Sequence, residues 1–139
     1  MAELSPYLNF NGKTEEAFNL YRSVFGGEFT NFQRFSDMPS EFPSAEDDMQ
    51  KILHVTLPIS KETSLMGSDI PASAPASVAG SNISISINTS SEEEANKIFK
   101  GLSEGGKITM PLEKTFWGAY FGMLTDKYEV QWMVNYDYK

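Results

Sequence analysis

Side chains able to contact and orient a small molecule recur two residues apart on three predicted strands. Alternate residues of a β-strand lie on one face of the sheet, so each such pair faces the same side. Imidazole, hydroxyl and amide groups on one face suit ligand binding better than they suit a core. The candidates with such groups are His54, Thr56, Ser84, Ser86 and Gln131. Met133, on the same strand face as Gln131, is a further candidate for contact with a ligand.

His54 is the one histidine of the chain and the residue best suited to catalysis. An imidazole gains and loses a proton near neutral pH, as a general base requires. The predicted strand places it on the same face as Thr56. The alternative is a histidine that is hydrogen-bonded to a neighbour and serves only the structure. The sequence leaves both interpretations open.

Trp117 is a further candidate, because an indole can stack on a flat ligand. It lies between Phe116 and Gly118. Gly118 and Gly122 are expected on one strand face, where they leave room for a ligand or for a close backbone. A structural role for Trp117 is equally compatible with this pattern. Trp132 is expected in the core, since it shares a strand face with Val130 and Val134.

The first half of the chain predicts a strand, a helix and three further strands. Thr14 is expected to be the helix N-cap, and Gly26 ends the helix by adopting a left-handed conformation. Ile52 is expected to share a strand face with His54 and Thr56. The apolar stripe of the helix is Ala17, Phe18, Tyr21, Val24 and Phe25, and the strands are expected at 6–10, 28–35, 52–57 and 63–69.

The second half repeats the same order of elements. Ser91 is the expected N-cap of its helix, with Glu94 reaching back to form a capping box. Ile83, with Ile85 and Ile87, is expected on the apolar face of the strand before this helix. The helical stripe is Ala95, Ile98, Phe99 and Leu102, and the strands are expected at 82–88, 107–115, 116–125 and 130–135.

Residues 36–50 contain two prolines and five acidic side chains, and they predict a long loop. One interpretation is a solvated run of charge. The other is a binding loop in which Met38 and Phe42 close over a ligand. The solvated loop is the preferred interpretation.

One helix followed by three strands, written twice, predicts an α+β fold of two tandem βαβββ modules. The first module spans 1–70, a linker rich in Ala, Ser and Pro spans 71–81, and the second module spans 82–139. Each helix covers one face of a curved mixed or antiparallel sheet. The other faces carry polar or mixed side chains, and we expect them to surround a cleft.

The composition excludes several classes of function. A formal net charge of −8 disfavours binding to nucleic acid and to anionic membranes. The chain has no cysteine, so disulfides, thiolate nucleophiles and Cys-ligated metals are excluded. Its beginning lacks the basic and apolar regions of a signal peptide, and no apolar stretch reaches the length of a membrane span. A cytoplasmic protein is expected.

Several motifs resemble PhnB-like proteins of the vicinal oxygen chelate superfamily, which includes glyoxalase I, bleomycin-resistance and fosfomycin-resistance proteins, and extradiol dioxygenases. The motifs span nearly the whole chain in the expected order. They lie at 7–12, 15–27, 65–69, 105–106, 110–112, 116–118 and 130–135. The resemblance implies a single glyoxalase-like domain over 1–139 and a homodimer. This branch often carries a demethylubiquinone methyltransferase label, but the sequence has no glycine-rich nucleotide loop after a strand.

In metal-using relatives, the resemblance implies a divalent ion held by His, Gln or Glu from the first strand of each module and by carboxylates from the last. By register these positions fall at Pro6 or Tyr7, at Ser84 and at Met133. Such residues are poor ligands for Zn²⁺, Ni²⁺ or Fe²⁺. We therefore expect no cofactor and no metal site.

The function expected from the sequence is metal-free binding of a small molecule, with the specific activity unknown. The alternative is a cytoplasmic enzyme of the lyase, isomerase or dioxygenase type. It would act on a small oxygenated substrate, with His54 as base or metal ligand.

Overall fold

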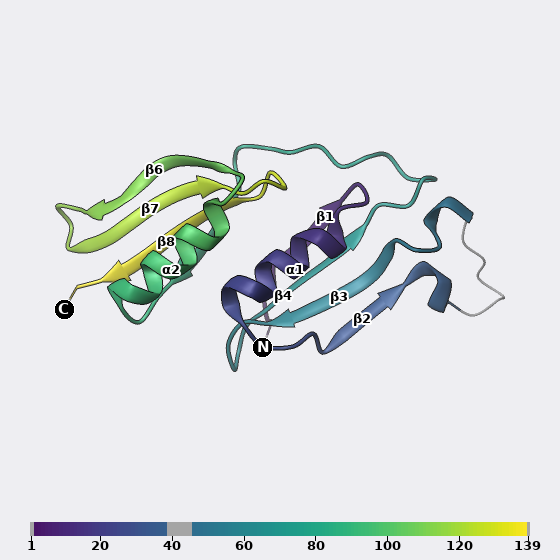
Figure 1. The fold of residues 1–139 in the computed structure, drawn as a ribbon, viewed down its shortest axis with the longest axis horizontal. Coiled ribbons are helices and arrows are strands. Elements are labelled where there is room, and N and C mark those ends of the chain that lie inside the picture. The colour runs from purple at the N-terminus through teal and green to yellow at the C-terminus, as the bar shows by residue number, and fades with distance from the viewer. Residues whose placement is uncertain (1, 39–45, 139) are drawn as a thin grey trace. The chain divides into compact units, whose positions relative to one another are not determined.

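The computed structural model describes residues 2–38 and 46–138. Phe42, one of the two apolar residues expected to cover a ligand, lies outside these ranges. The chain divides into two compact units, Met1–Val78 (unit 1) and Ala79–Lys139 (unit 2). Each unit is a four-stranded sheet with one helix (Figure 1), so the predicted α+β fold of two βαβββ modules is confirmed.

The two sheets have the same topology. In unit 1 the strand order is β1-β4-β3-β2, and in unit 2 it is β5-β8-β7-β6. The first strand of each unit pairs in parallel with the last, and the remaining pairs are antiparallel. The elements of unit 1 are β1 (Tyr7–Phe10), α1 (Thr14–Phe25), β2 (Asn31–Arg34), β3 (Ile52–Pro58) and β4 (Ser64–Asp69). Those of unit 2 are β5 (Ile85–Asn88), α2 (Glu92–Ser103), β6 (Lys107–Lys114), β7 (Ala119–Thr125) and β8 (Gln131–Asp137).

Helix α1 buries its apolar stripe against one face of its sheet. Ala17, Phe18 and Tyr21 are fully buried, and Val24 is nearly so, as predicted; Phe25 is half-buried. Gly67 on β4 allows this close approach, because a Cβ there would lie 2.7 Å from Phe18 Cε1.

The start of α1 differs from the prediction. Lys13 holds the N-cap position without a side-chain hydrogen bond, and Thr14 is the first helical residue. Thr14 instead donates from its backbone N (3.0 Å) and its Oγ1 (2.7 Å) to Asp69 Oδ1. Gly12 N donates to the same oxygen, and Ile52 N donates to Asp69 Oδ2 at 2.8 Å. A buried carboxylate from β4 thus satisfies the backbone N–H of Thr14, the first residue of the helix.

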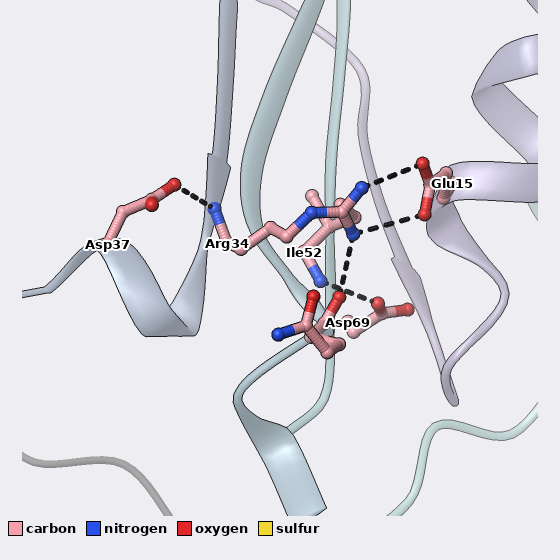
Figure 2. A network of polar contacts seen from close by, with 6 residues as sticks. Glu15, Arg34, Asp37, Ile52 and Asp69 are labelled. Carbon is pink, nitrogen blue, oxygen red and sulfur yellow. Dashed lines mark hydrogen bonds and ion pairs between the residues drawn. The ribbon is translucent and has the colours of Figure 1, made fainter.

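Arg34, at the end of β2, joins this region to the helix (Figure 2). Its guanidinium donates two hydrogen bonds to Glu15, at 3.0 and 2.8 Å, and a third to the carbonyl of Gln50. The hydrogen bond from Arg34 lowers the pKa of Glu15, and the same bond raises that of Arg34. Asp37 accepts a bond from the backbone N of Arg34 and closes a short 3₁₀ turn (Phe35–Asp37).

The face predicted for Ile52 is wrong. Gln33 pairs with His54 but Arg34 pairs with Ile52, so Leu53 is an extra residue in the ladder. Such a bulge breaks the two-residue alternation. Ile52 is therefore buried with the core, away from the polar face of His54.

Most described residues of the loop at 36–50 are exposed, as predicted, but one of its acidic side chains is buried. Asp48, in a second 3₁₀ turn (Glu46–Asp48), is buried. It accepts bonds from the backbone N of Ala72 and from Lys51 Nζ, the latter at 2.8 Å. The hydrogen bond from Lys51 lowers the pKa of Asp48. The carboxylate of Asp48 thus links the end of the loop to Ala72, in the segment that follows β4.

In unit 2, helix α2 buries its whole predicted stripe of Ala95, Ile98, Phe99 and Leu102. Ser91 Oγ accepts a bond from the backbone N of Glu94, which confirms the N-cap. Glu94 Oε1 accepts a hydrogen bond from the backbone N of Ser90, one residue before the N-cap, rather than from the N-cap residue itself. Trp132 is 2% exposed, as predicted, and its Nε1 donates to Asp126 Oδ2.

Two predictions for unit 2 are wrong. Gly118 lies in the turn before β7 with φ of 89°, so it does not share a strand face with Gly122. Gly122 does leave room for a close backbone, one of the two predicted alternatives, since a Cβ there would lie 3.0 Å from Leu112 Cα and 2.8 Å from Phe99 Cε1. Ile83 precedes β5 and is 76% exposed, because the strand begins only at Ile85.

Candidate functional site

The face of the first sheet that turns away from α1 carries polar side chains. We call it the helix-free face of unit 1. Its residues alternate along β3 and β4 with Val55 and Gly67, which are buried, Gly67 against α1. One row of cross-strand partners consists of Tyr7, Met66, Thr56 and Asn31; a second pair is Gln33 and His54.

A chain of hydrogen bonds crosses this face from β1 to β3, over the intervening strand β4. Tyr7 Oη lies 3.2 Å from His54 Nδ1, and His54 Nε2 lies 3.0 Å from Thr56 Oγ1. The rings of Tyr7 and His54 are tilted by 40° with centroids 5.7 Å apart. His54 and Thr56 are half-buried, whereas Tyr7 is 43% exposed. The structure thus brings the predicted pair together and adds Tyr7.

Both ring nitrogens of His54 are occupied by protein hydroxyl groups. A neutral imidazole has one donor and one acceptor nitrogen, so one neighbour donates to the ring and the other accepts from it. A ligand or metal ion could reach either nitrogen only by displacing Tyr7 or Thr56. Of the three side chains linked by these hydrogen bonds, Tyr7 is the most exposed to solvent.

The helix-free face of unit 2 has a different character. Its first row of cross-strand partners consists of Ser86, Met133, Met123 and Met110. The second row consists of Asn88, Asn135, Phe121 and Glu113. Asn135 Nδ2 donates to Asn88 Oδ1 at 3.2 Å, which links two of these strands through their amides. The face therefore combines polarisable thioethers with amide groups.

The other predicted residues of unit 2 lie at the edges of this face. Ser84 is exposed and precedes β5. Gln131 donates from Nε2 to the carbonyl of Ile83 at 2.6 Å, so part of its amide is used within the protein. Trp117 lies in the hairpin turn between β6 and β7 and is 58% exposed. Its ring contacts Phe116 and Phe121 edge-on, with centroids 5.0 and 6.1 Å apart.

The family described as 3-demethylubiquinone-9 3-methyltransferase matches residues 2–135. The chain belongs to this family. Protein YjdN of Escherichia coli is 33% identical over 95% of this chain and 93% of its own length. The family resemblance predicted from the motifs is thereby confirmed.

Solved structures agree with this family. Protein PA1353 from Pseudomonas aeruginosa is 39% identical over the whole of both chains, with a TM-score of 0.89. A putative 3-demethylubiquinone-9 3-methyltransferase from Bacillus cereus, described as a PhnB protein, is 27% identical over 97% of this chain and 99% of its own, with a TM-score of 0.76.

The wider fold is that of the glyoxalase, bleomycin-resistance and dioxygenase superfamily. A domain of that superfamily from Frankia has a TM-score of 0.70 over 100% of this chain and 94% of its own. Its sequence is 8% identical, so the likeness concerns the fold alone.

The residues at the ligand positions that the resemblance implies do not suit a divalent metal ion. By the register that the resemblance implies, the ligand positions fall at Pro6 or Tyr7, at Ser84 and at Met133, none of which is a preferred ligand of such an ion. Within residues 2–38 and 46–138, no three His, Cys, Asp or Glu side chains are grouped so as to hold a metal ion. Over the same residues, no helix is long and apolar enough to cross a membrane.

Proposed function

We propose that this protein binds a small organic molecule on the helix-free faces of its sheets, without a resident metal ion. The chain of hydrogen bonds through Tyr7, His54 and Thr56 is the observation that carries the proposal. It places three polar side chains from two strands on a sheet face that the unit's own helix leaves uncovered.

A purely structural face would not require this arrangement. An imidazole with hydroxyl groups on both nitrogens is held in one orientation, and such fixed polar groups are typical of sites that orient a ligand. Met66, the strand partner of both Tyr7 and Thr56, adds a polarisable apolar surface between them. The face can therefore contact both the polar groups and the carbon frame of one small molecule.

In unit 2 we propose a second set of ligand contacts on that unit's own helix-free face. Met133 and Ser86 lie opposite each other there, and Trp117 offers an exposed indole for stacking. Ser84 and the unused part of the Gln131 amide complete the set. Each of the two sets is proposed from its own unit alone.

A thermal-shift screen of small molecules, run with a chelator present, tests the proposal. A ligand at about 100 times its dissociation constant stabilises the folded state by roughly 2.7 kcal/mol. We expect at least one compound to raise the melting temperature in chelator. Stabilisation that appears only after a divalent metal ion is added would contradict metal-free binding.

We also propose that the protein acts as a cytoplasmic homodimer. The sequence resemblance supports the dimer, and so do exposed apolar side chains in unit 2, among them Ile108, Met110 and Phe116. The cysteine-free composition is compatible with the cytoplasm. Light scattering coupled to gel filtration tests the dimer: we expect twice the chain mass, and the mass of one chain would contradict it.

A further inference from the structure

We infer that the phenolic oxygen of Tyr7 is the atom that meets the ligand, and that it accepts a hydrogen bond from a ligand hydroxyl. His54 is then a positioning residue, which acts on the ligand through Tyr7. This inference rests on the ligand-binding function proposed above and gives that function a substrate class, a small hydroxylated organic molecule.

The first step is the direction of the hydrogen bonds around His54. A phenol is a more acidic donor than the aliphatic alcohol of threonine. Tyr7 is therefore the better donor to Nδ1, at 3.2 Å, and the ring proton then resides on Nε2. Nε2–H in turn donates to Thr56 Oγ1 at 3.0 Å. The neutral ring is held as the Nε2–H tautomer, with the phenolic hydrogen of Tyr7 and the ring hydrogen of His54 both committed inside the protein.

The second step concerns the lone pairs of the Tyr7 oxygen, which remain available when its hydrogen is donated to His54. With its hydrogen directed at His54, the phenolic oxygen offers only lone pairs to an incoming molecule. Its hydrogen bond to the ring makes that oxygen a better acceptor, because chains of hydrogen bonds polarise one another. Tyr7 is 43% exposed, while His54 is half-buried behind two protein hydroxyls. A hydroxyl donor on the ligand is the group that this oxygen fits.

The third step is the surface beside the phenol. Met66 is the strand partner of Tyr7 and is half-buried on the same face. A thioether there makes favourable contacts with ring edges and aliphatic carbon. The oxygen of Tyr7 and the side chain of Met66 thus suit a molecule that has a hydroxyl on a carbon frame.

The single histidine makes the first step directly measurable. In protein labelled with ¹⁵N-histidine, the two ring nitrogens come from His54 alone. At a pH where the ring is neutral, we expect the nitrogen shifts of the Nε2–H tautomer. Tyr7→Phe should move these shifts toward a mixture of tautomers, and Thr56→Val should do the same. A dominant Nδ1–H tautomer, or shifts unchanged in Tyr7→Phe, would overturn the inference.

Tyr120→Phe is the matched control, since it removes one phenolic hydrogen bond, from Tyr120 Oη to Asn96 Oδ1 at 2.7 Å in unit 2. We expect it to leave the His54 signals unchanged. Because Tyr7 is 43% exposed, Tyr7→Phe should retain the fold, which circular dichroism and the melting temperature verify.

Phenol and anisole test the ligand class, since they differ in the hydroxyl hydrogen. We expect phenol to shift the His54 signals, and to bind about tenfold more weakly to Tyr7→Phe. Anisole should bind the natural protein as weakly as phenol binds the variant. Equal binding of phenol to both proteins, or no response to phenol, would overturn the inference. The proposed function would then still be decided by the thermal-shift screen.

Discussion

Asp69, at the end of β4, accepts hydrogen bonds from Thr14 at the start of α1, where Thr14 itself was expected to act as the N-cap. Its Oδ1 accepts bonds from both the backbone N and the Oγ1 of Thr14, at 3.0 and 2.7 Å. The helix start is thereby tied to the sheet by a buried carboxylate. That bond network fixes the strand on which Met66 lies, between Tyr7 and Thr56.

Replacing Asp69 by Asn should destabilise the protein by about 2 kcal/mol, because one carboxylate oxygen that accepts backbone bonds becomes an amide donor. Urea unfolding followed by circular dichroism measures the change. Asp37→Asn is the control, since Asp37 is exposed and accepts one backbone bond from Arg34. Equal losses in the two variants would contradict the role assigned to Asp69.

Gly122→Ala should cost about 1–3 kcal/mol, because the added methyl group overpacks the contact between β7 and α2. The new Cβ would lie 2.8 Å from Phe99 Cε1 and 3.0 Å from the backbone of Leu112. Gly80→Ala serves as control, since the nearest atom to its Cβ, Asn82 Oδ1, lies 3.7 Å away. The melting temperature should fall in the first variant only. A Gly122→Ala protein as stable as the control would show that the space between Gly122 and Phe99 can accept a methyl group.

Glu15→Gln should make stability less dependent on pH. The hydrogen bond from Arg34 lowers the pKa of Glu15 below its ordinary value of 4.5. The carboxylate therefore stabilises the folded state above about pH 4.5, and this contribution is lost as the pH falls through the lowered pKa. Both partners are partly exposed, so we expect a difference of at most about 1 kcal/mol at neutral pH.

Urea unfolding of Glu15→Gln and the natural protein at about pH 7 and about pH 3 measures this difference. The two proteins should differ at the higher pH and converge at the lower one. Glu16→Gln provides the comparison, because Glu16 pairs with Lys13 and both side chains are well exposed. A difference that persists in acid would show that the hydrogen bond to Arg34 does not depend on the charge of Glu15.

Protein purified without chelators should contain far less than one Zn, Ni, Mn or Fe ion per chain. The physical reason is the expected donor set, since the register implied by the resemblance places Pro6 or Tyr7, Ser84 and Met133 where ligands would be needed. Elemental analysis by mass spectrometry measures the content. One metal ion per chain that disappears in His54→Ala would contradict the metal-free account.

The sequence predicted the features that depend on neighbouring residues. The apolar stripes of both helices follow from the helical period, and the Ser91 cap follows from residues within one turn. The repeated order of elements predicted the shared topology of the two sheets. The polar face of His54 and Thr56 followed from strand alternation alone.

The sequence could not predict features that join distant residues. Tyr7 and His54 are 47 positions apart, and Thr14 and Asp69 are 55 apart, so neither bond leaves a local pattern. The bulge at Leu53 shifted Ile52 to the other face because register depends on the partner strand. Only the register argument, which placed one ligand position of metal-using relatives at Pro6 or Tyr7, drew attention to this residue.

Amide chemical-shift mapping is the most direct test of metal-free ligand binding on the helix-free faces. A compound from the thermal-shift screen is added, with chelator present, to ¹⁵N-labelled protein. We expect shifts on the helix-free face of unit 1, at Tyr7, His54, Thr56 and Met66, any further shifts on the helix-free face of unit 2, and little change in α1. Shifts that avoid the helix-free face of unit 1, or that vanish in chelator and return with a divalent ion, would contradict this proposal.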